Sequence, residues 1–280
     1  MARLLLSSHF IEAGLRGEEF DLDFESAKKL TRVLRLTAGE IFVAFDGSGR
    51  EWECVLTSIQ EEDASGRKSI GARAAILSER ETSFGGRVKI SVAQAIPKGD
   101  KMELVLQKGT ELGVAEFWPF EAERSVAKVL SDDDDGQRAT IRAERWRKIV
   151  AQASMQCGRA EVPIVHAIAD FSTVVGVGTG NGRCFLLDEA PQIESFKAAL
   201  RREAIAFDAE APPPVMLLIG PEGGWSERER EWAERYGVEA VGLGRLILRT
   251  ETAALVAAAV LQWEAGVLGE AANSSSASEV

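Results

Sequence analysis

The spacing of hydrophobic and polar positions changes near residue 80. Before that point, short β-rich runs alternate with turn residues, and a short helical pattern lies between Glu25 and Arg35. The predicted strands are Ile41 to Phe45, Trp52 to Ile59 and Ser69 to Leu77, with the turn signal Asp46-Gly47-Ser48-Gly49 between the first two. The pattern predicts a small β-barrel or β-rich module over residues 1–78.

After a predicted linker at Thr82 to Gly86, strand-like runs alternate with helical patterns. The predicted strands are Val88 to Ala95, Glu116 to Phe120, Val162 to His166, Cys184 to Leu187, Val215 to Ile219 and Val238 to Leu243. The predicted helices are Lys101 to Gly113, Arg138 to Gln156, Ile193 to Glu203, Ser226 to Tyr236 and Thr250 to Gly266. This alternation predicts an α/β domain over residues 79–268, with a mainly parallel sheet and helices on both faces. The Ser- and Ala-rich residues 269–280 are expected to form a disordered tail.

Two strand–loop–helix segments predict a ligand site. The first contains the turn Gly220-Pro221-Glu222-Gly223-Gly224, and the second runs from Leu243 to Thr252. Loops at the carboxyl ends of parallel strands are the usual place for a ligand in an α/β domain. Neither loop has the Lys-Ser/Thr pair of a phosphate-binding P-loop, which disfavours a triphosphate. The alternative is a structural glycine turn, because Ser226 and Glu229 predict a capping box for the next helix.

The second loop places Arg249 and Glu251 between two apolar runs, where charges are costly unless they are paired or used. We expect Thr250 or Thr252 to cap the following helix. From Thr252 to Trp263 that helix is apolar almost all round, so every side of it needs a cover. A second subunit is expected to cover the side that does not face the sheet, with burial inside a monomer as the alternative.

Composition narrows the functional classes. The net charge of −11 argues against a protein that coats nucleic acid non-specifically, although a local basic patch can still dock on RNA. The three cysteines are odd in number and widely spaced, so no metal site or redox pair is predicted. No run is long enough for a membrane span, and no signal peptide is recognisable. A reduced, cytoplasmic environment is the simplest expectation.

Two clusters of basic residues are candidates for RNA contact. Lys28, Lys29, Arg32 and Arg35 lie in the N-terminal module, and Arg138, Arg142, Arg145 and Lys148 lie on the helix near Trp146. A solvated basic helix face is an equally good interpretation of either cluster.

Five ordered motifs together resemble the RsmE family. They are Lys108-Gly109-Thr110-Glu111-Leu112-Gly113-Val114, Glu123-Arg124-Ser125, Gln156-Cys157-Gly158-Arg159, the Gly220 to Gly224 turn and Leu248-Arg249-Thr250-Glu251-Thr252-Ala253. Arg32-Val33-Leu34-Arg35-Leu36 with Phe45-Asp46-Gly47 is similar to the family's N-terminal PUA-like module. The family consists of bacterial methyltransferases of the SPOUT class that act on uridine N3 in small-subunit (16S) ribosomal RNA.

The resemblance implies a knotted SPOUT-type parallel-sheet domain, with a C-terminal trefoil knot, preceded by a PUA-like β-barrel domain. It also implies S-adenosyl-L-methionine (SAM) as cofactor, a homodimer, 16S rRNA or the small ribosomal subunit as partner, and no metal or membrane. The implied cofactor-binding residues are Leu187, Gly220, Pro221, Glu222, Gly223, Gly224, Leu243, Gly244, Leu248, Arg249, Thr250 and Thr252. The implied RNA contacts are Lys29, Arg32, Arg35, Arg124, Arg145 and Arg159.

For catalysis, Arg249 is the candidate cation that stabilises a uracil anion, and Glu222 or Glu251 is expected to orient it or accept the N3 proton. Two positions depart from the family pattern: Lys29 stands where a histidine is common, and Leu246 stands where a basic residue often precedes Ile-Leu-Arg. Three alternatives stay open: a SPOUT enzyme acting on another base or on a ribose 2′-oxygen, a non-catalytic RNA-binding assembly factor, and a nucleotide hydrolase.

Overall fold

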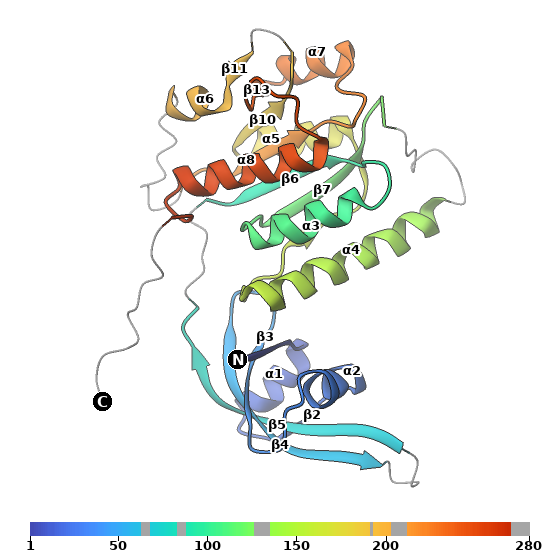
Figure 1. Ribbon diagram of the computed structural model, residues 1–280, viewed down its shortest axis with the longest axis vertical. Helices are drawn as coiled ribbons and strands as arrows, with labels where there is room; N and C mark the ends of the chain where they lie inside the picture. The colour runs from blue at the N-terminus through green and yellow to red at the C-terminus, as the bar shows by residue number, and fades with distance from the viewer. Residues whose placement is uncertain (63–67, 83–87, 126–134, 191–192, 203–211, 270–280) are drawn as a thin grey trace. The chain divides into compact units, whose positions relative to one another are not determined.

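The computed structural model describes residues 1–62, 68–82, 88–125, 135–190, 193–202 and 212–269 (Figure 1). The chain divides into two compact units. Unit 1 comprises Met1–Gly85 and Ala151–Val162, and unit 2 comprises Gly86–Val150 and Pro163–Val280. The sequence alone placed a single boundary near residue 78 and assigned 151–162 to the second domain. The predicted disordered tail falls almost wholly on residues outside the described ranges.

Unit 1 is built on one five-stranded sheet with the order β1-β3-β4-β5-β2. Its elements are β1 (Ala2–Leu5), α1 (Ser8–Leu15), β2 (Phe20–Asp21), α2 (Phe24–Lys28), the π-helix η1 (Lys29–Val33), β3 (Ile41–Phe45), β4 (Glu51–Glu62) and β5 (Lys68–Arg80). β1 and β3 are parallel, and the other pairs are antiparallel. Phe42, Trp52 and Leu30 are fully buried in its core. The predicted β-rich module is confirmed, whereas α1 was not predicted.

Unit 2 contains an eight-stranded sheet with the order β11-β13-β10-β12-β6-β7-β8, and β9 also pairs with β7. The strands are β6 (Ile90–Ala95), β7 (Glu116–Glu121), β8 (Ile164–Val165), β9 (Ala169–Asp170), β10 (Arg183–Leu187), β11 (Glu194–Ser195), β12 (Val215–Ile219) and β13 (Glu239–Gly242). The helices are α3 (Lys101–Glu111), α4 (Asp135–Cys157), α5 (Phe171–Asn181), α6 (Phe196–Arg202), α7 (Glu227–Arg235) and α8 (Thr250–Glu264), and the last turns of α4, from Ala151, belong to unit 1. Every described pairing in this sheet is parallel, which confirms the predicted parallel α/β domain.

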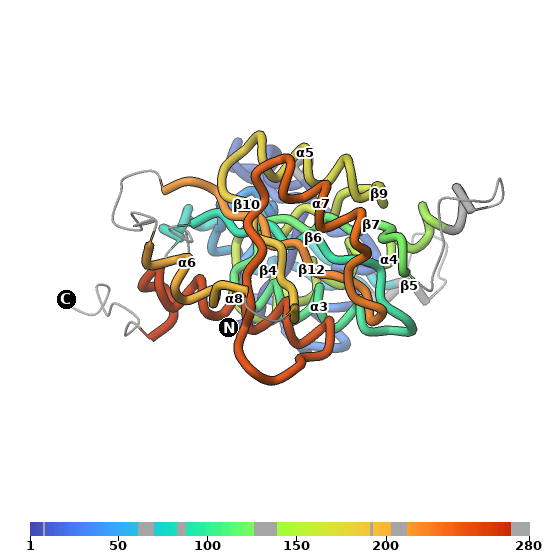
Figure 2. Tube along the Cα trace, turned by 90° about the horizontal axis from the view of Figure 1, so that it is seen from above, coloured from blue at the N-terminus to red at the C-terminus, as the bar shows by residue number. Residues whose placement is uncertain are grey.

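Helices cover both faces of the central strands (Figure 2). α5 and α7 lie on one side, over a cluster that contains Ala93, Leu186 and Leu218, while α3 and α8 lie on the other. All residues of β6 and β12 are buried. Strands that are buried along their whole length are typical of a parallel sheet covered by helices on both faces. The trefoil knot stays a prediction, because strand order and register alone do not fix how the chain threads.

Two local predictions differ from the structure. The predicted helix from Ile193 begins only at Phe196, because Glu194–Ser195 form β11 and pair with β13. α5 was not predicted, since its sequence FSTVVGVGTGN combines glycines with β-branched residues, both poor helix formers. The helix forms because Val174 and Val175 pack into the core and Asp170 caps it, accepting a hydrogen bond of 2.7 Å from the Thr173 N–H.

Two helical glycines provide a matched test of packing in unit 2. A Cβ atom on Gly109 of α3 would lie 2.8 Å from the fully buried ring of Phe117, whereas a Cβ on Gly176 of α5 would meet open space. Gly109→Ala should therefore lower the free energy of unfolding by about 1–3 kcal/mol through overpacking. Gly176→Ala should raise it by about 0.4–1 kcal/mol, because alanine restricts the unfolded chain. Urea unfolding of both variants checks this, and equal effects would contradict the packing argument.

Candidate functional site

A pocket of about 420 Å³ lies at the carboxyl edge of the unit 2 sheet. β10, β12 and β6 are parallel neighbours, so the segments that follow them emerge at the same edge. The loop after β13 joins them because β13 pairs with β10. The predicted cofactor residues that line this pocket are Leu187, Gly220, Pro221, Glu222, Gly224, Leu243, Gly244, Leu248, Arg249 and Thr250. Gly223 and Thr252 are not part of its lining, and neither is Glu251, which is buried beside it.

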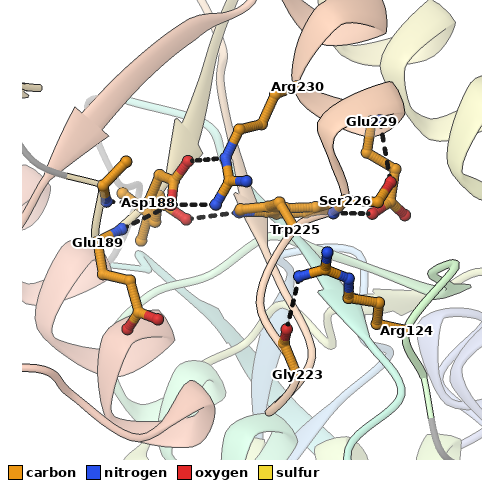
Figure 3. A network of polar contacts seen from close by, with 10 residues as sticks. Arg124, Asp188, Glu189, Gly223, Trp225, Ser226, Glu229 and Arg230 are labelled. Atoms are coloured by element: carbon orange, nitrogen blue, oxygen red, sulfur yellow. Dashed lines mark hydrogen bonds and ion pairs between the residues drawn. The ribbon is translucent and has the colours of Figure 1, made fainter.

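The glycine turn after β12 is held against the end of β10 by Trp225 (Figure 3). The buried indole donates from Nε1 to the carbonyl of Leu187 at 2.8 Å. A Cβ atom on Gly220 would lie 3.0 Å from the same indole, so the close approach of strand and ring favours glycine there. Gly224 has φ +66°, a left-handed conformation that glycine adopts without strain. The turn therefore has one well-defined shape.

The turn also leads into α7 through the predicted capping box, which is present. The Ser226 hydroxyl accepts from the Glu229 N–H at 3.2 Å, and Glu229 accepts from the Ser226 N–H at 2.9 Å. The same two side chains bind the segment after β7: Ser226 Oγ donates to Glu123 at 2.7 Å, and Glu229 accepts from the Glu123 N–H at 2.9 Å. Arg124 donates to the Gly223 carbonyl at 3.3 Å (Figure 3). Capping thus also ties the Glu123-Arg124 segment to the glycine turn.

The prediction that Thr250 or Thr252 caps α8 is wrong. The N-cap residue is Arg249, and no side chain bonds to the cap position. The Thr250 hydroxyl instead donates to the Gly220 carbonyl at 2.6 Å and accepts from the Gln94 Nε2 amide at 2.8 Å. Gln94 is fully buried at the end of β6. A hydrogen-bond chain therefore joins the ends of β6 and β12 to the start of α8.

Lys101 lies between two carboxylates at the pocket. Its Nζ is 2.9 Å from Glu222 and 3.6 Å from Glu251, and the Lys98 N–H also donates to Glu222 at 3.1 Å. Burial would raise the pKa of Glu222, but the hydrogen bonds from Lys101 and the backbone lower it overall. The bond to Glu222 raises the pKa of Lys101. Arg249 is exposed on the pocket rim and, within the described part of the chain, forms no ion pair with either glutamate.

Asp188, directly after β10, forms the other strong ion pair of the site. Arg230 of α7 contacts its carboxylate at 2.6 and 3.1 Å, and the N–H groups of Glu189 and Ala190 also donate to it (Figure 3). Burial would raise the pKa of Asp188, but these bonds outweigh it and hold the pKa below its usual value. The pair fixes the loop that carries Glu189 on the pocket wall.

Sequence reasoning missed Lys101 and gave Trp225 no role of its own, although both line the pocket. Four other lining residues, Asp188, Glu189, Leu246 and Ile247, lie within the loops Leu187 to Glu189 and Leu243 to Thr252, which the family resemblance assigned to the cofactor. A signal for Lys101 was available, because Pro97-Lys98-Gly99-Asp100 is a turn that follows a predicted buried strand. Such a turn shares the sheet edge with the turn after β12. Trp225 gave no such signal, since its role depends on how closely β10 approaches it.

The predicted RNA contacts are distributed over both units. In unit 1, Arg32 and Arg35 are exposed, whereas Lys29 is half-buried with its Nζ 2.8 Å from Met155 Sδ. In unit 2, Arg124 is exposed, and Arg145 is exposed and paired with Glu103 at 2.6 Å.

Arg159 differs from the other predicted contacts. Only 4% of it is exposed, and burial lowers the pKa of its guanidinium. Its Nη2 atom lies 3.8 Å from Glu161. In this conformation the Arg159 side chain is enclosed within unit 1 and does not present its charge to a phosphate. The sequence could not distinguish it from an exposed arginine, because it lies in a glycine-flanked segment next to a basic helix.

Comparison with known proteins identifies both parts of the chain. Residues 86–262 match the family model of an RNA methyltransferase domain, and residues 30–68 match an RNA methyltransferase PUA domain. Ribosomal RNA small subunit methyltransferase E from Bacillus subtilis (strain 168) is 30% identical over 89% of this chain and 91% of its own length. The protein of that name from Mycobacterium bovis is 33% identical, over 80% of this chain and 79% of its own length. The chain belongs to the ribosomal RNA small subunit methyltransferase E family.

Solved structures of this family agree with the fold. The enzyme from Neisseria gonorrhoeae, bound to S-adenosyl methionine, has a TM-score of 0.77 and 30% identity and covers 94% of this chain and 98% of its own. A methyltransferase from Legionella pneumophila in complex with SAM has a TM-score of 0.73 and 30% identity, with 88% and 92% coverage. Among the described residues, no group of His, Cys, Asp or Glu could hold a metal ion, and no helix could cross a membrane.

Removal of the Arg230 guanidinium should destabilise the fold in a pH-dependent way. Arg230→Ala leaves Asp188 buried without its cation, which should lower the free energy of unfolding by about 1–3 kcal/mol at pH ~7. In the native chain the folded pKa of Asp188 is depressed, so its stabilising effect is present at neutral pH and is lost as the pH falls through that pKa. In the variant the carboxylate loses the bonds from Arg230, so its pKa lies above that of the native chain, and its burial destabilises the fold only where it is ionised.

The difference between the two proteins should therefore shrink as the pH falls below the usual aspartate pKa of about 3.9. Urea unfolding across this range measures it. Arg228→Ala, on the exposed side of the same helix, serves as control and should change stability by no more than about 0.5 kcal/mol. A difference between Arg230→Ala and the native chain that is independent of pH would contradict the role given to Asp188.

Proposed function

We propose that this chain methylates N3 of a uridine in 16S ribosomal RNA with S-adenosylmethionine as methyl donor, and that it acts in the cytoplasm. The observation that carries the proposal is the pocket at the sheet edge, where the family's glycine turn and its Leu-Arg-Thr-Glu-Thr motif lie side by side. The relatives named above act on small-subunit ribosomal RNA, as their names state, and two solved relatives hold the proposed cofactor.

The pocket suits this cofactor in size and chemistry. Its volume lies within the range of small-molecule sites, about 300–1,000 Å³. Leu187, Leu243 and Leu248 provide apolar walls for an adenine ring, and the backbone of Gly220 to Gly224 offers hydrogen-bonding groups at close range. The carboxylate of Glu189 adds negative charge on the wall, which suits a ligand that carries a sulfonium and an ammonium group. When bound, the cofactor supplies an electrophilic methyl group.

Arg249 is the proposed catalytic cation. The N3 nitrogen of uracil must lose its proton before or during attack, and negative charge then develops on the ring. The Arg249 side chain is exposed on the rim and is not neutralised by Glu222 or Glu251, so its charge is available to that ring. A preorganised cation of this kind stabilises the transition state more than the ground state.

The two glutamates are proposed as orienting groups. The lowered pKa of Glu222 makes its carboxylate a weaker base, and Lys101 already holds it. Glu251 is buried and faces the same ammonium. We therefore favour a role for both in placing Lys101 and the two loops, and we assign proton removal to neither.

RNA is proposed to approach through exposed arginines. Arg124 lies beside the glycine turn, and Arg32 and Arg35 lie on unit 1. Arg145 and Lys29 could join only after leaving Glu103 and Met155, respectively. Methylation at N3 requires an exposed edge of the base, so the target nucleotide is expected to be unpaired or splayed out of its stack.

The proposal is tested on small ribosomal subunits from a strain that lacks the methylation. Incubation with the purified chain and methyl-labelled cofactor should yield labelled 3-methyluridine on nucleoside analysis. A 2′-O-methylated nucleoside or another methylated base would replace the proposed reaction with one of its alternatives. Absence of cofactor binding in calorimetry would favour a non-catalytic assembly factor.

Arg249→Ala should keep cofactor affinity within about tenfold of the native value and lower the methylation rate by about 10²–10³-fold, because its charge acts in the transition state. Arg245→Ala, an exposed arginine of the same loop outside the pocket lining, is the matched control and should keep most of the rate. Equal losses of affinity and rate in Arg249→Ala would show that Arg249 is structural.

A homodimer is proposed from the uncovered apolar surface of unit 2. In α8, Leu255, Val256, Ala259 and Val260 are only half-buried, and Trp263 is 63% exposed. Leu246 and Ile247 in the adjoining loop are 81% and 79% exposed. Apolar surface of this extent is typical of an interface.

Light scattering should give about twice the chain mass of 30.3 kDa for the native protein. Trp263→Glu should shift it toward the single-chain mass, because the new carboxylate would be buried in the interface. Ile141→Glu, at a 60% exposed position of α4, is the control and should leave the mass unchanged. A native protein of single-chain mass at micromolar concentration would overturn the dimer.

A further inference from the structure

One surface of unit 1 combines an exposed aromatic ring with a row of cations. Phe24, Lys28 and Arg32 follow one another at intervals of four residues along α2 and η1, and Arg35 comes just after (Figure 1 labels α2). All four are exposed, and 52% of Phe24 is accessible to solvent. We call these four residues the Phe24 stripe. Phe24 and Lys28 share one face of α2, where the Lys28 ammonium lies over the ring, and Arg32 and Arg35 belong to the exposed segment that continues the chain from there.

The backbone under the stripe is unusual. η1 is a π-helix, in which the Leu34 N–H bonds to the Lys29 carbonyl at 2.9 Å, and Arg35 then has φ +59°. A non-glycine residue in this left-handed region costs of order 1 kcal/mol. The result is that Arg32, Val33, Leu34 and Arg35 are all exposed in succession. A regular α-helix would turn part of such a run toward the core, and π-turns of this kind are frequent at functional sites.

The charges of the stripe are not cancelled by its acidic neighbours. Asp23 accepts bonds from the Ser26 N–H at 2.8 Å and from the Ser26 hydroxyl at 3.0 Å, which engages its carboxylate in capping α2. Glu25 is exposed on the adjacent face. The Lys28 ammonium lies over one face of the Phe24 ring, 5.7 Å from its centre, in a cation–π contact. A base that stacks on this face takes the place of the ammonium, which then binds a neighbouring phosphate. In a chain with a net charge of −11, this local positive surface selects an anionic partner.

We propose that the Phe24 stripe binds a single-stranded segment of RNA, with one unpaired base stacked on Phe24 and the neighbouring phosphates held by Lys28, Arg32 and Arg35. The inference rests on the proposed function in one respect, that the substrate is RNA, and it adds the binding mode and the residues Phe24 and Lys28. An exposed ring flanked by cations is the arrangement that single-strand binders use. A duplex would leave the ring without a base to stack on, because its bases are already paired and stacked.

The proposal is tested by fluorescence anisotropy on the full chain, with one labelled RNA presented as a single strand and as a perfect duplex. Phe24→Ala should weaken single-strand binding about 5–100-fold, the loss of one base–aromatic stack, and should change duplex binding less than twofold. Phe24→Trp should restore single-strand affinity, whereas Phe24→Leu, which keeps apolar bulk without a π-face, should not. Lys28→Ala should reduce the salt dependence, lowering the slope of log affinity against log salt by about 0.7.

Two controls lie in the same unit. Leu77→Ala removes an equally exposed apolar side chain from β5, and Arg16→Ala removes an exposed cation, and neither should change binding. Native affinity in Phe24→Ala, or full rescue by Phe24→Leu, would overturn the proposal.

The experiments distinguish failure of this proposal from failure of the proposed function. If 3-methyluridine forms but neither RNA binding nor methylation depends on Phe24, the proposed function holds and the role of the Phe24 stripe is wrong. If RNA binding depends on Phe24 but no 3-methyluridine forms, the role of the stripe holds and the proposed function is wrong.

Discussion

A buried chain of three polar groups fixes the shape of the pocket. Gln94 donates to Thr250, and Thr250 donates to the Gly220 carbonyl, so the ends of β6 and β12 and the start of α8 are held together. Gln94 and Thr250 are buried, so these hydrogen bonds are shielded from water, and each contributes about 0.5–1.5 kcal/mol. The glycine turn and the Arg249 loop can therefore keep a common wall although 29 residues separate Gly220 from Arg249 in the chain.

Ion pairs also hold the loops of the pocket in place. Lys101 pairs with two carboxylates from different segments, Glu222 at 2.9 Å and Glu251 at 3.6 Å, so a single ammonium connects both segments. Asp188 pairs with a different cation, Arg230 of α7. Within the described part of the chain Arg249 pairs with neither glutamate, which supports the cationic role proposed for it. This separation of structural from reactive charge is what the proposed chemistry needs.

Features that depend on neighbouring residues could be predicted from the sequence. Features that depend on contacts between distant segments could not. β12 is a continuous apolar run, and the Ser226–Glu229 capping box depends on four neighbouring residues, so both could be recognised. α5 could not, because its glycines and β-branched residues argue against a helix until Val174 and Val175 find the core. The prediction that Thr250 caps α8 was wrong because its two hydrogen-bond partners, Gln94 and Gly220, come from distant strands, which the sequence near Thr250 does not indicate.

The segment 151–162 shows why a linear boundary between the domains was misleading. Its end binds the turn between β3 and β4, with the Val162 N–H donating to the Gly47 carbonyl at 2.9 Å and the Gly49 N–H donating to the Ala160 carbonyl at 3.3 Å. These bonds complete unit 1 with residues that follow most of α4 in the chain. Arg159, which sequence reasoning grouped with the basic helix, is buried there for that reason. Among the predicted RNA contacts of unit 1, the exposed cations are therefore Arg32 and Arg35, which come from the N-terminal residues.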